Sequence, residues 1–226
     1  MTSANIARMS GRTRTRIGKQ WGRAEIARAA LDVIDRDGLE SLSMRRVAAE
    51  LHIDPMRLYR SVPNRDGMIC DVVALLLDEM DTSEQPGETW DQTMRRVSIS
   101  ERDMALRHPH AFPLVALAPR DEEPVLGHAN VLMELLTKGG LPADRFFDVW
   151  LVDAAFSNGF LLLATATLTR PEDPKESDVP TGTPHREDEL AAKMAATLSE
   201  EAFARGLDLI YAGLKDTFSR EQGPTQ

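Results

Sequence analysis

Residues 42–73 read LSMRRVAAELHIDPMRLYRSVPNRDGMICDVV, and this stretch decides the fold of the chain. Ser43 is a residue type that caps helix N-termini, and the apolar spacing behind it predicts a short helix to about Leu51. Asp54 is another good N-cap, and Pro55 then occupies the first helical position, where its missing N–H costs nothing. Two short helices joined by a tight turn have the proportions of a helix-turn-helix, whose second helix enters the DNA major groove.

The two faces of this predicted motif differ in polarity. Ala48 is small at the point where the two helices must approach each other closely. The side chains expected inside are Val47, Ala48, Leu51, Ile53 and Leu58. The second helix then presents Met56, Arg57, Tyr59 and Arg60 to solvent. An exposed face of this kind can reach base edges and phosphates.

Helical periodicity continues on both sides of the motif. Residues 22–37 place Ile26, Ala30, Val33 and Ile34 on one face, and Gly38 ends that helix. On the other side, Asn64 follows a proline and caps a longer apolar helix that we expect to run from Arg65 to about Met80.

The remaining sequence also predicts helices and no strands. The expected helices are residues 89–107, 112–117, 123–138, 143–168 and 199–218. Four prolines among acidic and small residues make 170–186 a predicted mobile loop. The expected fold class is therefore all-α, with an N-terminal three-helix domain that carries the helix-turn-helix, followed by a larger helical domain.

The net charge of −9 hides a strong asymmetry. Residues 1–65 hold 13 Lys and Arg against 7 Asp and Glu, or +6, while residues 66–226 hold 14 against 29, or −15. A basic end joined to an acidic body indicates a polyanion-binding end. Residues 1–22 are basic without any acidic residue, so we expect a disordered arm. That arm is either idle or reaches DNA phosphates and the minor groove.

The chain reads as a cytoplasmic protein with no membrane span. Cys70 is the single cysteine, which excludes an intrachain disulfide and a zinc site built on cysteine pairs. The first 21 residues lack the continuous apolar stretch of a secretory signal. Residues 149–168 are long and apolar enough to span a bilayer, but they contain Asp153 and Asn158. An ionised group at mid-membrane costs at least about 2.5 kcal/mol, so a helix buried within protein explains the pattern better.

The motif residues carry a resemblance to a known family. The stretch from Leu39 to Leu77, with the tripeptide 58–60 (LYR) and the break at 63–65 (PNR), resembles the DNA-binding domain of the tetracycline-repressor family of bacterial regulators. The body resembles the tetracycline-repressor-like branch more loosely, through RHPHAFPLV at 107–115, NGF at 158–160 and GLDLIYAGL at 206–214. The resemblance implies residues 23–67 as the DNA-binding domain and 68–220 as the ligand-binding and dimerisation domain.

The resemblance also implies roles for individual residues. Met56 and Arg57 would face base edges, and Arg57 could make the bidentate contact to guanine. Tyr59 would bind a phosphate, and Arg65 would bind one at the N-terminus of its helix. Two further positions in the first motif helix are DNA-contact candidates: Ser43, which could equally be only a cap, and Arg45, favoured over its neighbour Arg46.

His52 departs from the family, which usually has glycine at this position. Glycine readily adopts the left-handed backbone conformation of the turn, and histidine tolerates it better than β-branched residues do. We expect some strain at His52 and no loss of the fold.

The body is expected to form a dimer and a ligand pocket. The final helix carries an apolar stripe, Phe203, Leu207, Ile210, Leu214 and Phe218. Such a stripe is ordinarily core, but together with helix 143–168 it would build a four-helix interface with a second copy. The pocket candidates are Met104, His108, Phe112, Leu132, Phe147, Trp150 and Asn158.

The expected ligand is a small apolar or aromatic inducer. Val115 stands near the place where a tetracycline sensor has its metal-binding histidine, so tetracycline with magnesium is not expected. We expect no cofactor and no metal, since no phosphate-binding loop, nucleophile elbow or histidine pair at helical spacing is present. The sequence therefore predicts a ligand-responsive transcriptional regulator, most simply a repressor, that binds double-stranded operator DNA as a homodimer. A ligand carrier with vestigial DNA binding and an all-helical enzyme are the alternatives, and activation would need the same DNA contacts as repression.

Overall fold

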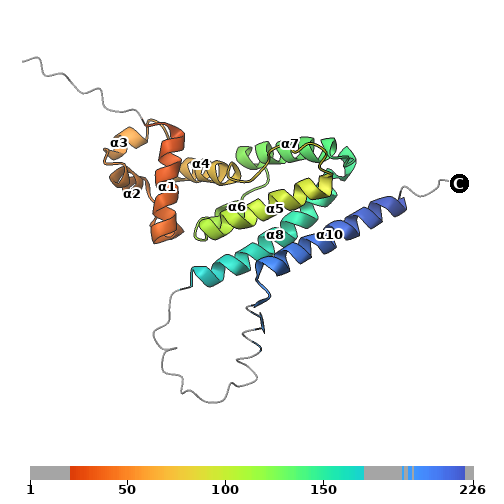
Figure 1. Ribbon diagram of the computed structural model, residues 1–226. Helices are drawn as coiled ribbons and strands as arrows, with labels where there is room; N and C mark the ends of the chain where they lie inside the picture. Colours follow the sequence, from red (N-terminus) through yellow and green to blue (C-terminus); the bar gives the residue numbers. More distant parts are fainter. Residues whose placement is uncertain (1–20, 171–189, 191–192, 195, 222–226) are drawn as a thin grey trace, which may run out of the picture.

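The computed structural model describes residues 21–170, 190, 193–194 and 196–221. Every regular element in these ranges is a helix, and they contain no strand, which confirms the predicted all-α class (Figure 1). The predicted basic arm, apart from its last two residues, and all but the first residue of the predicted loop 170–186 lie outside the described residues.

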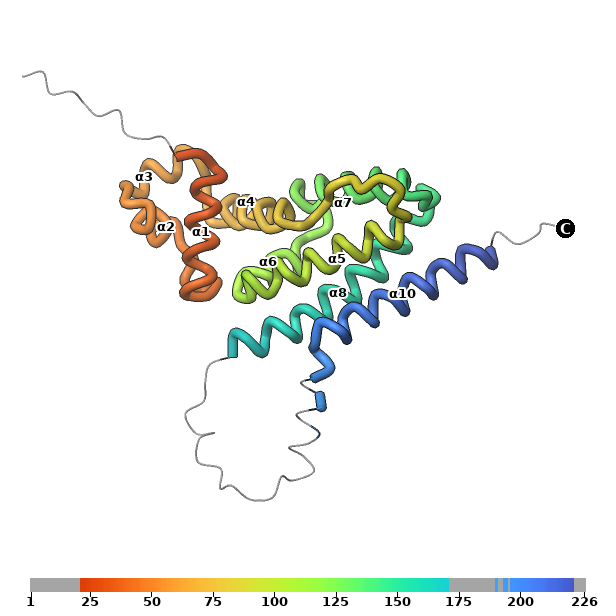
Figure 2. Tube along the Cα trace, in the orientation of Figure 1, coloured from red at the N-terminus to blue at the C-terminus, as the bar shows by residue number. Residues whose placement is uncertain are grey.

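The first four helical elements form a small head at one end of the molecule (Figure 2). They are α1 (Arg23–Asp37), the 3-10 turn η1 (Leu39–Ser41), α2 (Met44–Glu50) and α3 (Pro55–Leu58). Ile26, Val47 and Leu58 are fully buried where α1, α2 and α3 meet. The head thus has a hydrophobic core of its own, centred on the predicted apolar positions of the motif.

Each predicted N-cap in the head closes its helix as expected. Ser43 Oγ accepts a hydrogen bond from Arg46 N at 3.2 Å, and Asp54 Oδ1 accepts one from Met56 N at 2.8 Å. Asn64 Oδ1 accepts from Gly67 N at 2.8 Å at the start of the next helix. His52, in the turn, has φ 54°, so it adopts the left-handed conformation that favours glycine.

α4 (Arg65–Leu77) joins the head to the body as one continuous helix. It packs against α1 in the head and against α6 and α7 in the body. Met68 and Val72 are fully buried near its start, and Leu76 is fully buried near its end. The boundary expected at residue 68 falls inside this helix, and the helix ends three residues before the predicted Met80.

The body is a bundle of longer helices. Its elements are α5 (Trp90–Arg107), α6 (Phe112–Ala116), α7 (Glu123–Lys138), η2 (Ala143–Arg145), α8 (Phe146–Leu168) and α10 (Glu200–Glu221). α5 packs against α7, α8 and α10, and α8 also packs against α6 and α10 (Figures 1 and 2). Gly206 permits the close approach of α10 to α8, because a Cβ there would lie 2.1 Å from Phe156 Cζ.

The apolar stripe predicted on the last helix belongs to this bundle. Phe203 and Leu207 are fully buried, and the Phe203 ring stacks on Phe156 of α8 with 5.6 Å between ring centroids. Phe218 packs against Trp90 at the other end of α10. These three side chains are therefore core of one protomer, and any interface with a second copy must use other positions of the helix.

Residues 143–168 are the one described segment long and apolar enough to cross a membrane, a test that core helices also pass. In this chain, Asp153, Ser157 and Thr165 of α8 are buried within the bundle. Asp153 accepts hydrogen bonds from side chains of α5 and α10. The polar residues of this segment thus have a place in a protein core, as the sequence predicted.

Candidate functional site

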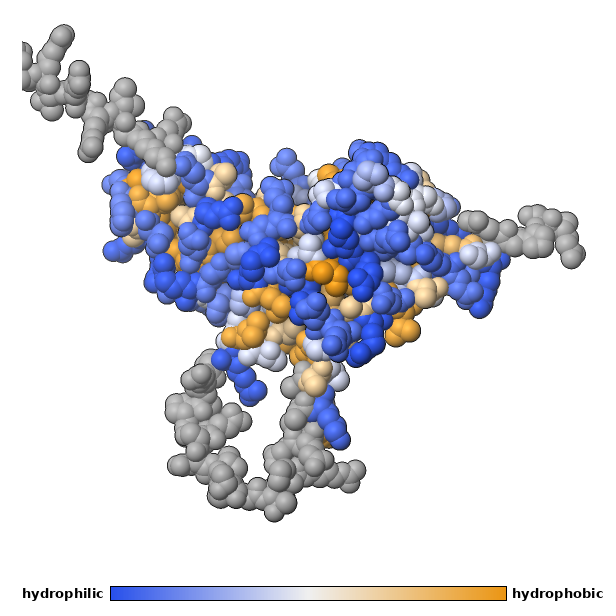
Figure 3. All heavy atoms as spheres, viewed as in Figure 1, coloured by the Kyte–Doolittle hydropathy of each residue, from blue (hydrophilic) through white to orange (hydrophobic). Residues whose placement is uncertain are grey.

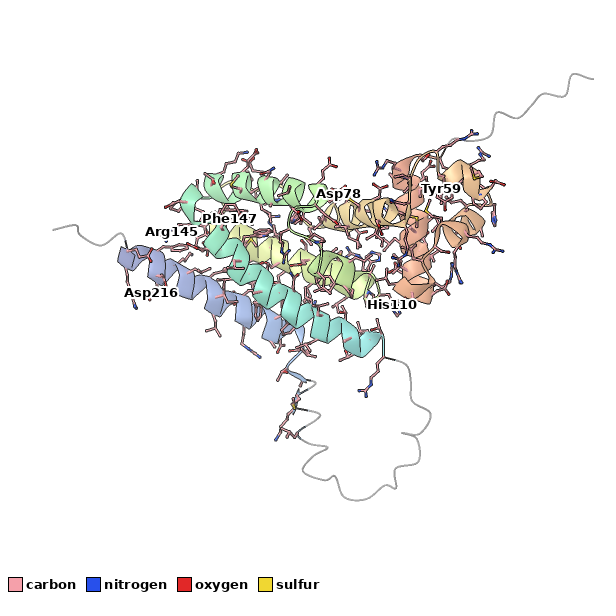
Figure 4. All side chains as sticks on the ribbon, turned by 180° about the vertical axis from the view of Figure 1, so that it is seen from behind. Tyr59, Asp78, His110, Arg145, Phe147 and Asp216 are labelled. Atoms are coloured by element: carbon pink, nitrogen blue, oxygen red, sulfur yellow. The ribbon has the colours of Figure 1, made fainter. Side chains whose placement is uncertain are left out.

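The exposed face of α3 lies at the outer end of the head, where Figure 4 labels Tyr59. Leu58 is fully buried and anchors α3 on the head, while Met56 is 70% exposed and Tyr59 is 47% exposed. Arg57 and Arg60 are exposed as well. The structure thus brings the predicted recognition residues together on one solvent-facing surface.

The arginines of α2 differ in their surroundings. The Arg46 guanidinium donates to Asp37 Oδ2 at 2.7 Å, so an acidic residue of α1 already holds it. Arg45 is exposed and has no hydrogen bond or ion pair with any residue in the described ranges. This difference favours Arg45 over Arg46 as the DNA contact, as the sequence suggested.

Ser43 and Arg65 both have structural tasks in the head. Ser43 is exposed but its hydroxyl oxygen already caps α2. Arg65 Nε donates to the carbonyl oxygen of Leu42 at 3.1 Å, and its Nη2 donates to that of Leu39 at 3.4 Å. Arg65 therefore ties the start of α4 to η1, a role that the sequence did not reveal. Its remaining N–H groups could still meet a phosphate, and that contact stays a prediction.

A cavity of about 60 Å³ lies in the body between α5, α7 and α8, with the end of α4 on one side. Its lining includes Leu132, Trp150 and Asn158, three of the seven residues predicted for the pocket. The lining is completed by Leu77, Met80, Met94, Val97, Ser98, Glu101, Val115, Arg120, Val125, His128, Asp153 and Ala154. Asn158 donates to the carbonyl oxygen of Ala116 at 3.3 Å, which holds its amide in place.

The predicted lining is corrected at the other four positions. Met104 and Phe112 are fully buried in the core between helices and do not reach the cavity. His108 lies at the end of α5, where its ring contacts the carboxylates of Asp35 in the head and of Glu79 just after α4. Phe147 is 65% exposed, because the preceding Phe146 takes the buried position and successive helical residues point about 100° apart.

The cavity wall also contains two carboxyl groups, those of Asp153 and Glu101, which the sequence did not predict as part of the pocket. Asp153 Oδ1 accepts from the hydroxyls of Tyr211, at 2.5 Å, and Ser98, at 2.9 Å. Glu101 lies one turn after Ser98 on α5. Burial raises the pKa of Glu101 to about 8, and that of Asp153 to about 6 even though both hydroxyls stabilise its charge. The signal in the sequence was the spacing Met94, Val97, Ser98, Glu101, which puts a carboxyl on an otherwise apolar face.

A larger open groove of about 620 Å³ runs between α4 and α7. Leu77 and His128 line both this groove and the cavity, so the two spaces meet at these side chains. The rest of the groove lining is Arg23, Cys70, Asp71, Ala74, Asp78, Thr82, Glu123, Pro124, Gly127 and Val131. A molecule larger than the cavity could therefore reach it by displacing the Leu77 and His128 side chains.

Among the described residues, no three His, Cys, Asp or Glu side chains are placed to hold a metal ion. Val115, at the position singled out in the sequence, is part of the cavity wall.

Sequence comparisons place the body in a known family. The family model described as "Tetracyclin repressor-like, C-terminal domain" matches residues 83–218. The chain is 35% identical over 105 residues to the HTH-type transcriptional repressor DrrR1 of Streptomyces coeruleorubidus, covering 45% of this chain and 36% of that protein. It is 26% identical over 200 residues to the class D tetracycline repressor protein of Escherichia coli, covering 85% and 88%. The chain thus spans about a third of the length of the first relative and most of the second.

Solved structures share the fold. A possible transcriptional regulator of this family from Streptomyces coelicolor A3(2) superposes with a TM-score of 0.67 at 22% identity, covering 86% of this chain and 99% of that one. The S. coelicolor protein ActR in complex with actinorhodin superposes with a TM-score of 0.63 at 25% identity, covering 86% and 95%. The Acinetobacter baumannii AYE protein crystallised with minocycline superposes with a TM-score of 0.65 at 20% identity. The superposition covers 87% of this chain and 98% of that one.

These superpositions cover the head, α4 and the body of this chain, so the fold is shared along most of its length. The chain belongs to the tetracycline repressor-like family of transcriptional regulators.

Proposed function

We propose that this protein is a cytoplasmic transcriptional regulator that binds a near-palindromic operator as a homodimer and is released by a small ligand with an apolar or aromatic body. The observation that carries the proposal is the exposed face of α3, where Met56, Arg57 and Tyr59 surround the buried anchor Leu58. Arg57 would read guanine, Met56 would contact a base edge, and Tyr59 would bind phosphate. The charge of +6 on residues 1–65 supports binding to a polyanion.

A second copy of this chain would cover an apolar surface on α8 and α10. Figure 3 shows apolar residues gathered on this side of the body. The exposed large side chains there are Leu151, Val152, Leu163 and Leu168 of α8 and Leu209 of α10. Exposed large apolar side chains on two helices that pack side by side favour an interface there. Paired in a two-fold four-helix contact, two protomers would set their α3 helices about one DNA turn apart, which calls for a near-palindromic site.

Coupling between ligand and DNA would pass through α4. Its first residue, Arg65, is bonded to the head, and its last residue, Leu77, lines the cavity and the groove. The cavity of about 60 Å³ is much smaller than the roughly 300–1,000 Å³ of most ligand sites, so binding must enlarge it. An enlargement at Leu77 moves the end of α4, and the ligand then favours a state with a different spacing of the two heads.

Two of the related structures that hold ligands contain minocycline and actinorhodin. By analogy we propose a small molecule with an aromatic body for this chain, bound in the cavity where Trp150 and Leu132 supply apolar walls. No enzymatic reaction forms part of this proposal.

The experiment that tests it is selection of bound duplexes from a random library by the purified full chain, at about physiological salt because affinity for DNA depends steeply on salt. We expect recovery of a near-palindrome. An Arg57→Ala variant should enrich a degenerate base at one position of each half-site. Recovery of no sequence, with only weak salt-sensitive binding, would contradict the proposal and favour a ligand carrier.

A further inference from the structure

Glu101 is an unusual residue for the wall of an apolar cavity. It follows Met94, Val97 and Ser98 on one face of α5, and all four side chains line the cavity. No hydrogen bond or ion pair joins the Glu101 carboxyl to any residue within the described ranges. Because this partly buried carboxyl has no protein partner, its hydrogen-bonding capacity is available to a ligand group.

Asp153 supplies a second acceptor to the same cavity. The residue is 3% exposed, and both hydrogen bonds from Tyr211 and Ser98 go to Oδ1. Oδ2 receives no hydrogen bond from the residues that the structure describes. Because Tyr211 and Ser98 fix Oδ1, the Asp153 carboxyl is held in a defined orientation with one oxygen available.

No positive group forms an ion pair with either carboxyl among the described residues. The Arg120 guanidinium lies 5.4 Å from the centre of the Trp150 ring, and its charge partly offsets the rise in the Glu101 pKa without an ion pair. His128 faces the cavity from α7, and burial lowers its pKa, which favours the neutral ring. The inner cavity therefore has two acidic groups and one arginine at its edge.

The groove that meets the cavity at Leu77 and His128 is acidic as well. Asp71, Asp78 and Glu123 line it, and its one arginine, Arg23, is bonded to Asp71 at 2.7 Å. A concave surface lined by one sign of charge raises the local concentration of molecules of the opposite sign. The route from solvent to the cavity thus attracts cations and repels anions.

We propose that the ligand of this site is an organic cation, a protonated amine carried on an aromatic or apolar body. The ammonium group would donate to Glu101 and to Asp153 Oδ2, and the body would lie against Trp150 and Leu132. This inference rests on the proposed function of the site as a ligand pocket and adds the charge of the ligand to it. The unpaired Glu101 carboxyl, the fixed orientation of Asp153 and the acidic groove all lead to the same chemistry.

The test uses three naphthalene compounds that share one aromatic body and differ in charge: 1-naphthylmethylamine, 1-naphthalenemethanol and 1-naphthoic acid. Calorimetry or the change in tryptophan fluorescence gives the dissociation constant of each with the full chain in the absence of DNA. Hydrogen bonds to charged groups are worth roughly tenfold or more in affinity. We therefore expect the amine to bind at least about tenfold tighter than the alcohol, and the acid to bind weakest.

The variants identify the carboxyl responsible. Glu101→Gln keeps the shape of the side chain and replaces the carboxyl by an amide that cannot ionise against a bound ammonium, so it should weaken binding of the amine about tenfold while leaving the alcohol unchanged. Glu134→Gln is the matched control, because Glu134 is exposed on α7, outside the cavity lining. If the Asp153→Asn variant folds, it should weaken amine binding as Glu101→Gln does. If it does not fold, the result with Glu101→Gln alone tests the proposal.

Three outcomes would overturn the inference: an amine that binds no better than its alcohol, a preference for the acid, or an amine affinity that Glu101→Gln leaves unchanged. The regulator function would survive any of them, because a neutral or anionic inducer could still release the protein from its operator. Conversely, tight and Glu101-dependent binding of the amine by a chain that selects no DNA sequence would support the cation site in a carrier.

Discussion

The Nδ1 atom of His108 lies 2.7 Å from Oδ2 of Asp35, so the end of α5 in the body is bonded directly to α1 in the head. The Nε2 atom of the same ring lies 3.3 Å from Oε2 of Glu79, just after α4. Arg107 also bonds to Glu79, at 2.7 Å. One imidazole thus connects the head, the α4 terminus and the body, and this position explains why His108 is absent from the cavity for which the sequence predicted it.

His108→Ala should destabilise the protein by about 1–3 kcal/mol, because it leaves the half-buried Asp35 carboxyl without a partner. Asp35 Oδ1 is already buried without a hydrogen bond from any described residue, and burial raises the pKa of this carboxyl. Urea unfolding measures the effect. His110→Ala is the control, since His110, labelled in Figure 4, is two residues away and makes no hydrogen bond with any described residue. Equal losses of stability in the two variants would contradict a stabilising contact between His108 and Asp35.

Arg57→Ala and Tyr59→Phe should damage DNA binding in different ways. Loss of a bidentate guanine contact should cost about 1–3 kcal/mol and relax the preference at one base pair per half-site. Loss of the Tyr59 hydroxyl, a phosphate contact, should weaken binding to all sequences about equally.

Both effects are measured by titrating each variant with the selected operator and with single-base variants of it. Arg95→Ala removes the same charge from α5 in the body, so it serves as the control for net charge. If Arg57→Ala and Tyr59→Phe lose affinity in parallel on every sequence, the assignment of the recognition face is wrong.

Leu163→Glu should convert the proposed homodimer to a monomer. Leu163 is 63% exposed on α8, and a charge introduced there would have to be desolvated in the interface. Sedimentation analysis gives the oligomeric state, and operator binding should fall with it. Leu126→Glu introduces the same charge at an exposed leucine of α7 and should leave the dimer intact. A dimeric Leu163→Glu variant would mean that copies associate through another surface.

Glu101 should make the empty protein less stable as the pH rises. Burial first, and then the charge of Asp153, raise the pKa of Glu101 to about 8, with Arg120 opposing. His128 and Tyr211 are the other titratable groups that contribute to this site. A carboxyl whose pKa is higher in the folded chain than in the unfolded chain stabilises the fold fully below its unfolded pKa. That contribution is lost as the pH rises through the folded pKa.

The Glu101→Gln side chain stays neutral at every pH. The melting temperature of this variant minus that of the wild type should therefore increase between about pH 5 and pH 8 and stay constant above pH 8. Thermal unfolding at a series of pH values measures this difference. Glu134→Gln, with an exposed carboxyl on α7, should show no such trend. A difference between Glu101→Gln and wild type that does not change with pH would mean that Glu101 is ionised throughout.

The head could be predicted from the sequence almost residue by residue. Ser43, Asp54 and Asn64 act through local hydrogen bonds, and a local rule needs no knowledge of the rest of the chain. His52 at φ 54° follows from the same reasoning. The tie from Arg65 to the Leu42 carbonyl joins residues 23 positions apart and has no local signal.

The cavity was harder to predict, because its lining depends on which face each helix turns inward. α8 is apolar on nearly all sides, so periodicity could not rank Phe146 against Phe147, and only packing on the other helices decides. Asp153 was visible in the sequence as an obstacle to a membrane span. Its hydrogen-bond partner Tyr211 lies 58 residues further along the chain, so no local sequence pattern could place Asp153 in the cavity wall.

Because α4 is one continuous helix, it limits where the head and body of two related proteins can be recombined. Met68 and Val72 complete the core at one end of the helix, and Leu76 and Leu77 complete it at the other. A hybrid joined at residue 68 would bring together half-helices from two parents, and each buried side chain would meet foreign neighbours. Recombination that preserves function should instead fall between residues 78 and 89, so that the head and the whole of α4 come from the same parent.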